Sequence, residues 1–157
     1  MTTYEERHAA ARQLDARLAA ANAQWGKSEV FVENGELLGQ LVSRIALAGN
    51  GRDVSYIAAD VTEVAVRLTI FVDGAVIDAS FKEGAIVVDV LPLDIRSLRV
   101  TSTENYYPDD RVDPDQPLAV NVTLAEGRTL TLRGSGADDD PLNLFLPVLL
   151  SLTSAGE

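Results

Sequence analysis

The chain has 157 residues, with no cysteine, one histidine and one tryptophan. Without cysteine it can form no disulfide, no thiolate zinc site, no iron–sulfur cluster and no thiol nucleophile. The single histidine, His8, argues against a metal site built from several histidines and against a His-based catalytic triad. We therefore expect a non-enzymatic protein that needs no metal ion and no other cofactor, with His8 as an ordinary surface residue.

Positive charge is also scarce, since 13 Lys and Arg residues face 24 Asp and Glu residues, for a net charge of −11. An excess of negative charge argues against nucleic-acid backbones and anionic membranes as partners. The longest apolar-rich stretch, Leu142 to Leu152, is shorter than the roughly 20 residues that span a bilayer. The first residues do not form a basic segment followed by an apolar one. We expect a soluble cytoplasmic protein.

The N-terminal segment predicts an Ala-rich helix over residues 3–24. Thr3 can cap it, and Glu5 and Glu6 suit the positive end of the helix dipole. Gly26 is placed to end it. The apolar stripe of this helix is thin, so we expect it to dock on a sheet or on a second copy of itself.

The next segment is open to two interpretations. Asn34-Gly35 follows β-type residues and is a strong hairpin signal. In residues 36–48, Leu37, Leu41 and Ile45 have helical spacing, whereas residues 42–48 also alternate as a strand would. We favour a hairpin at Asn34-Gly35 with a strand over residues 42–48.

Residues 64–133 alternate between apolar and polar side chains with a period of two, which predicts antiparallel strands. Acidic-Gly pairs at Asp73-Gly74, Glu83-Gly84 and Glu126-Gly127 separate them and predict tight turns. Such a series of hairpins indicates an antiparallel meander and an α+β protein that is mostly antiparallel β.

A C-terminal helix is predicted from Pro141 to about Thr153, because three Asp residues and then a Pro form a specific start signal. Pro147 should bend it. The helix is apolar all round and so needs cover on more than one side. Its inner side is expected to comprise Leu142, Phe145, Leu146 and Leu149. The outer side would then present Leu144, Val148 and Leu152, a patch that favours self-association as a homodimer.

Residues 85–100 read AIVVDVLPLDIRSLRV, while residues 122–134 and 143–150 read VTLAEGRTLTLRG and NLFLPVLL. These stretches resemble the bacterial form of the pleckstrin-homology-like (PH-like) family, and the resemblance covers roughly residues 56–153. The resemblance implies a β-barrel or sandwich capped by the C-terminal helix, and a binding module. It implies a PH-like domain over residues 55–157, with residues 1–54 as a helix-and-hairpin extension. Some PH-like domains bind phosphoinositides through basic loops, but the matching turns here are acidic.

A loop that is rich in acidic residues and proline is expected over residues 103–117. Its aspartates would either bind Ca²⁺, although they lack the EF-hand order, or form a solvated surface. Its two tyrosines would either anchor a partner or pack back on the domain. The candidate interaction residues of the whole chain are Tyr106, Tyr107, Asp109, Asp110, Leu144, Val148 and Leu152.

Three functions fit these observations. The favoured one is an acidic module that acts by protein–protein contact with an unidentified protein partner. The second is an inhibitor or immunity-type protein that occludes a basic enzyme surface or nucleic-acid-binding surface. The third is a small-ligand-binding protein, or an enzyme, with a pocket in the β-structure.

Overall fold

A computed structural model describes residues 3–103, 118–134 and 140–155. The protein is α+β, with two antiparallel sheets, and it divides into two compact units, Met1–Pro92 and Leu93–Glu157. The domain boundary expected at residue 55 falls inside the first unit. Each unit is described by itself.

Helix α1 spans Tyr4–Ala21 and begins with the predicted cap. The Thr3 hydroxyl accepts a hydrogen bond from the Glu6 amide at 3.2 Å, and the Glu6 carboxylate accepts one from the Thr3 amide at 3.4 Å. This capping box satisfies amides that the helix leaves unpaired. The helix ends at Ala21, before the expected glycine, because Asn22 leaves the helical conformation and donates its side-chain amide to the Ala59 carbonyl at 2.9 Å.

The hairpin expected at Asn34-Gly35 and the strand expected over residues 42–48 are both wrong, since the structure has two helices here: α2 over Glu29–Glu33 and α3 over Leu37–Gly49. Neither residue has the positive φ that a tight hairpin turn needs. Asn34 instead donates its side-chain amide to the Val30 carbonyl at 2.8 Å and closes α2. The helical spacing of Leu37, Leu41 and Ile45 is the pattern that the structure uses, because all three side chains are buried.

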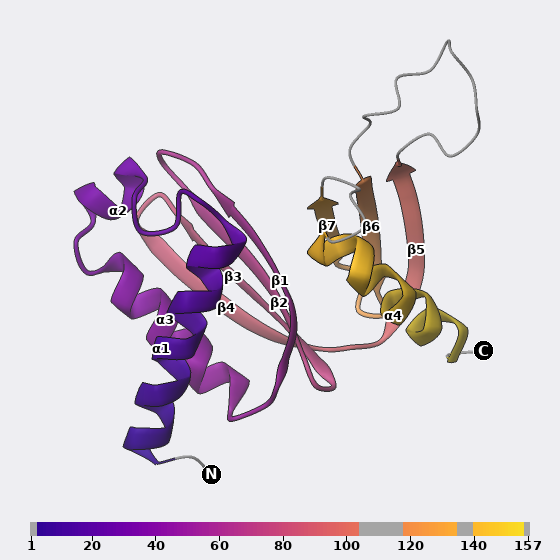
Figure 1. Cartoon of the computed structure of the whole chain (residues 1–157), viewed down its shortest axis with the longest axis horizontal. Helices are drawn as coiled ribbons and strands as arrows, with labels where there is room; N and C mark the ends of the chain where they lie inside the picture. The colour runs from indigo at the N-terminus through magenta and orange to yellow at the C-terminus, as the bar shows by residue number, and fades with distance from the viewer. Residues whose placement is uncertain (1–2, 104–117, 135–139, 156–157) are drawn as a thin grey trace. The chain divides into compact units, whose positions relative to one another are not determined.

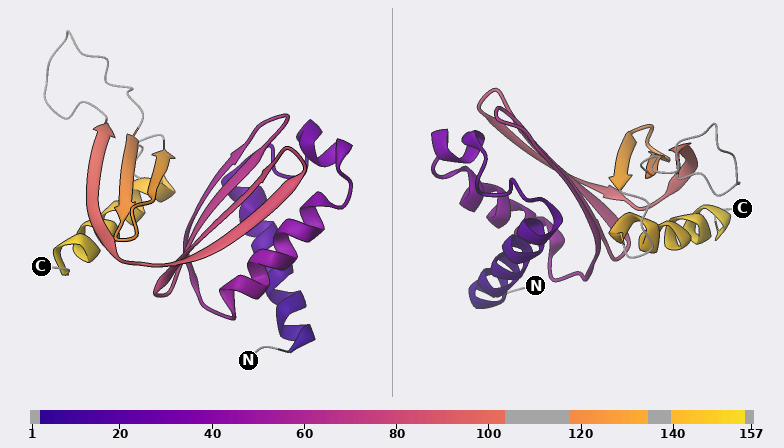
Figure 2. Two further views of the ribbon diagram at one scale, coloured as in Figure 1. Left: turned by 180° about the vertical axis from the view of Figure 1, so that it is seen from behind. Right: turned by 45° about the horizontal axis from the view of Figure 1, so that its top comes forward.

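The meander prediction is confirmed in the first unit. Strands β1 (Val54–Val61), β2 (Val66–Val72), β3 (Ala75–Lys82) and β4 (Ala85–Pro92) pair antiparallel in chain order. The predicted turn at Asp73-Gly74 joins β2 to β3, and the one at Glu83-Gly84 joins β3 to β4. Helices α1 and α3 lie on one face of this sheet (Figures 1 and 2).

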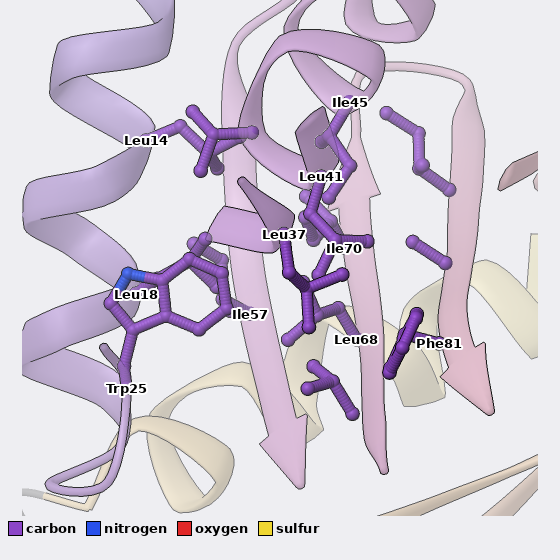
Figure 3. Close-up of a cluster of buried hydrophobic side chains, with 14 of the residues drawn as sticks. Leu14, Leu18, Trp25, Leu37, Leu41, Ile45, Ile57, Leu68, Ile70 and Phe81 are labelled. Atoms are coloured by element: carbon purple, nitrogen blue, oxygen red, sulfur yellow. The ribbon is translucent and has the colours of Figure 1, made fainter. Parts of the chain in front are cut away.

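The core of the first unit lies between these helices and the sheet. Leu14 and Leu18 from α1 and Leu41 and Ile45 from α3 point toward the sheet, where Ile70 lies beneath them (Figure 3). The packing of the sheet on the helices explains why apolar residues recur at every second position of β1–β3, since these residues face the helices. The cluster is completed by Trp25, Val30, Phe31, Leu37, Val42, Ile57, Val66, Leu68, Val72, Ala75, Ile77, Ala79 and Phe81.

The second unit is a sheet of β5 (Ile95–Ser102), β6 (Leu118–Leu124) and β7 (Thr129–Gly134), followed by α4 (Pro141–Ala155). The predicted turn at Glu126-Gly127 joins β6 to β7. Helix α4 lies against β5 and β7. Its expected start is confirmed, because the Asp140 carboxylate accepts a hydrogen bond from the Leu142 amide at 3.1 Å. The helix continues through Pro147 to Ala155.

The two sheets are separate in their hydrogen bonding, and within the described ranges no ladder joins them into a closed barrel. The α+β class, the antiparallel strands and the terminal helices are therefore as expected. Within the described ranges, the strand ladders do not form the closed barrel that the PH-like resemblance implies.

Candidate functional site

The outer side of α4 carries an apolar stripe that nothing covers in the described structure. Leu144 is 64% exposed, Val148 47% and Leu152 36%. Because they are spaced four residues apart, they lie along one side of the helix. We call these three residues the α4 surface. All three residues are exposed, as expected from the sequence, and together they form an apolar row rather than single scattered positions.

The inner side of α4 explains why the outer side is left over. Leu142, Phe145 and Leu149 are buried against the second sheet, as predicted, and Leu146 is only half-buried at the boundary. Leu150 is 48% exposed but falls outside the stripe by its helical spacing. One side of α4 therefore fills the core of its unit, and the α4 surface has no role in that core.

Helix α4 carries no ionisable side chain. Its sequence is PLNLFLPVLLSLTSA, whereas 24% of the whole chain is charged. Neighbouring exposed residues on the helix are Pro147 and Ser151. Because charged residues are depleted at the centres of protein interfaces, a charge-free apolar helix side has the composition of an interface core.

The other face of the second sheet is polar and follows a ladder of short side chains. The Thr123 and Thr129 hydroxyls lie 3.1 Å apart, and the Thr131 hydroxyl donates to the Asn121 side chain at 3.1 Å. Arg99 lies opposite Asn121 in the register. These side chains satisfy one another, which is the normal arrangement of a solvated sheet face.

The first unit contains a cavity of about 350 Å³ between α1, α3 and the sheet, which we call the α1–α3 pocket. Its polar rim comprises Gln13 and Arg17 of α1 and the segment Gly51–Asp53, which precedes β1. Its apolar floor belongs to the core described above, part of which Figure 3 shows. Sequence reasoning missed this pocket, because its rim unites residues 35 positions apart, Arg17 and Arg52.

One rim arginine is held at the pocket through its side chain and the other through its main-chain amide. The Arg17 guanidinium donates from Nη1 to the Val54 carbonyl at 3.0 Å. The Arg52 amide donates to the Gly49 carbonyl at 3.0 Å, which fixes the turn after α3. Neither guanidinium forms an ion pair with any carboxylate of the described ranges. Both retain donors for a ligand, since a guanidinium has five N–H groups.

Four of the predicted interaction residues, Tyr106, Tyr107, Asp109 and Asp110, lie outside the described residues, as does the rest of the acidic loop that carries them. His8 is exposed on α1 and stacks on Tyr4, with ring centroids 6.2 Å apart. Across the described residues, no group of three His, Cys, Asp or Glu side chains is placed to hold a metal ion.

Comparison of the chain with models of protein families, with curated proteins and with solved structures finds no match. The PH-like resemblance thus stays an expectation from the sequence. Over the described part of the chain, every helix is too short or too polar to cross a membrane.

Proposed function

We propose that this protein is a non-enzymatic, cytoplasmic protein–protein interaction module that acts as a homodimer through its α4 surface. The observation that carries the proposal is the exposed stripe of Leu144, Val148 and Leu152 on a helix without charge. A second copy is the occupant that fits best, for two reasons of geometry and charge.

The stripe is self-complementary. Val148 lies midway between Leu144 and Leu152, four residues from each. When two copies of α4 pack antiparallel about a two-fold axis near Val148, each Leu144 meets a Leu152 of the partner. A two-fold interface needs this kind of patch, one that matches itself after rotation.

Charge restricts where two copies can meet. Each copy carries a net charge of −11, so most approaches bring like charges together. Helix α4 contributes no charge to the contact. Repulsion is therefore lowest where the apolar stripe is, and both effects favour the same surface.

The expected dimer is weak. Burying a whole Leu or Val side chain contributes about 1.5–3 kcal/mol, and each residue of the stripe is between a third and two thirds exposed. Two copies contribute six such side chains, a small apolar area for an association that must also offset the loss of translational and rotational freedom. We therefore expect self-association that depends on concentration.

The matched test is a pair of variants. Replacing Leu144 and Val148 together by Ser should abolish self-association in sedimentation velocity, because the apolar stripe is lost. The control is Leu47→Ser on α3, which changes a leucine that is 57% exposed and lies outside α4. It should leave self-association unchanged. Equal effects of the two variants would contradict the proposal, provided that circular dichroism shows both to be folded.

The PH-like architecture remains part of this proposal. Its support is local: three antiparallel strands followed by an apolar helix, in the order that the resemblance implies for the C-terminal part of such a domain. Many PH-like domains are binding modules, which agrees with an interaction role.

A further inference from the structure

We propose that the α1–α3 pocket binds a small amphipathic anion, with its carboxylate on Arg17 and Arg52 and its apolar body between α1 and α3. This inference concerns the first unit and does not rest on the α4 surface. It follows from three properties of the pocket: the space between the helices, the apolar floor, and the charge at the rim.

The space arises because small residues line the helices where they flank the pocket. Ala10 of α1 and Ala46 and Gly49 of α3 contribute little or no side chain. A methyl group added at Gly49 would lie 3.8 Å from Cδ1 of Ile77, at ordinary van der Waals distance. The cavity of about 350 Å³ is at the small end of ligand pockets, which run from about 300 to 1,000 Å³.

The floor selects an apolar body. It is formed by buried side chains of the core, namely Leu14, Ile45, Ile70, Val72 and Ile77. A polar group placed against them would lose its hydration without gaining a hydrogen bond. The volume equals that of roughly a dozen water molecules at about 30 Å³ each, which suits a short alkyl chain or one ring.

The rim selects an anionic head. Arg17 and Arg52 carry two positive charges, against one carboxylate, that of Asp53. The C-terminal end of α3 also lies there, but a helix end contributes only about half a negative charge. The rim is therefore net positive in a chain whose net charge is −11. Guanidinium groups match the planar, two-oxygen geometry of a carboxylate.

The test uses the full-length, ¹⁵N-labelled chain and hexanoate as the probe, followed by amide chemical shifts. We expect saturable shifts with a millimolar dissociation constant, confined to residues 10–17 and 45–54. Hexan-1-ol, which keeps the chain and lacks the charge, should bind at least about tenfold more weakly. Equal binding of the alcohol, or shifts centred on α4, would overturn the proposal.

Substitutions separate the pocket from the rest of the surface. Arg17→Gln and Arg52→Gln should each weaken hexanoate binding at least about fivefold, because each removes a charge-assisted contact. Arg44→Gln, on an exposed position of α3 outside the pocket, is the matched control and should change nothing. Ala46→Leu should fill the space and abolish binding.

Thermal melts would show whether each variant is folded. If Ala46→Leu fails to fold, the two arginine variants and the alcohol decide the question. Unchanged affinity in both arginine variants, or no shifts at all with the wild-type chain, would refute the site.

Discussion

The indole N–H of Trp25 donates a hydrogen bond to the Asp15 carboxylate at 2.8 Å. The contact ties the segment after α1 back to the middle of that helix. The Trp25 ring also packs edge-on against Phe31, with centroids 4.9 Å apart and an interplanar angle of 72°. One buried side chain thus joins α1, α2 and the connection between them.

We predict that Trp25→Phe and Asp15→Ala each lower the free energy of unfolding, by about 1–3 and 1–2 kcal/mol respectively. The first loses the hydrogen bond and part of the packing, and the second loses a charge-assisted bond that is only partly buried. Urea denaturation measures both. The double variant should cost less than the two single effects added together, because the shared bond is lost only once. Strict additivity would contradict a direct bond.

The turn between β3 and β4 holds a non-glycine residue in the left-handed region. Glu83 has φ +54° and Gly84 has φ +82°, the pattern of a type I′ turn. Glu83→Asn should stabilise the protein by about 0.5–1 kcal/mol, since Asn accepts this conformation more readily than Glu. Gly84→Ala should destabilise it by about 1 kcal/mol. Gly35→Ala is the control, because Gly35 has no positive φ and no atom near an added Cβ. A loss as large as that of Gly84→Ala would argue against the turn assignment.

Gly134 and Asp140 are sterically coupled at the start of α4. A methyl group at Gly134 would meet the Asp140 carboxylate and would approach Cβ of Leu142 to 3.0 Å. Gly134→Ala should therefore displace the N-cap and speed hydrogen exchange of the α4 amides about tenfold, the equivalent of about 1.4 kcal/mol. In an Asp140→Ala background the same change should cost less. An equal cost in both backgrounds would mean that the cap is not what the methyl group displaces.

The strands could be predicted from the sequence because every second residue of each strand is apolar. In β2, Leu68 and Ile70 belong to the core under the helices, while the residues before each of them, Arg67 and Thr69, are polar. The sequence pattern alternates in this way although Thr69 is itself buried. The turns could be predicted for a similar reason, since Gly74 and Gly84 adopt the positive φ that their residue types suggest.

Helix α3 could not be predicted in the same way, because two periods coexist in residues 36–48. Its buried stripe contains Leu41, Val42 and Ile45, and neighbouring small residues also allow an alternating pattern. The Asn-Gly pair favoured the strand, yet Asn34 closes a helix through its side chain. Tertiary packing on the sheet selects the helix, and the local sequence does not reveal that packing.

The two candidate sites also differ in how far the sequence could predict them. The exposure of Leu144 and Val148 could be predicted from the sequence of α4 alone, because one side of that helix is buried and the other side is left exposed. The α1–α3 pocket depends on Arg17 and Arg52 meeting across a fold, which only the tertiary structure shows.

Salt should strengthen self-association. Two copies with a net charge of −11 repel each other, and raising NaCl from about 20 to about 300 mM screens that repulsion while leaving the apolar contact in place. An inhibitor that recognises a basic surface would behave in the opposite way, because salt weakens attraction between opposite charges. Sedimentation velocity across this range, with the Leu144→Ser, Val148→Ser double variant as control, separates the two functions. Weaker self-association at high salt would count against an apolar, charge-free interface.

The most direct test of the central claim is the molar mass of the wild-type chain as a function of its concentration. Sedimentation equilibrium from about 5 to about 500 µM would cover the range expected for a weak dimer. The account predicts a weight-average mass that rises from the 16.8 kDa of one chain toward twice that value. A mass that stays at that of one chain across the whole range, at moderate salt and with a folded protein, would contradict the proposed dimer.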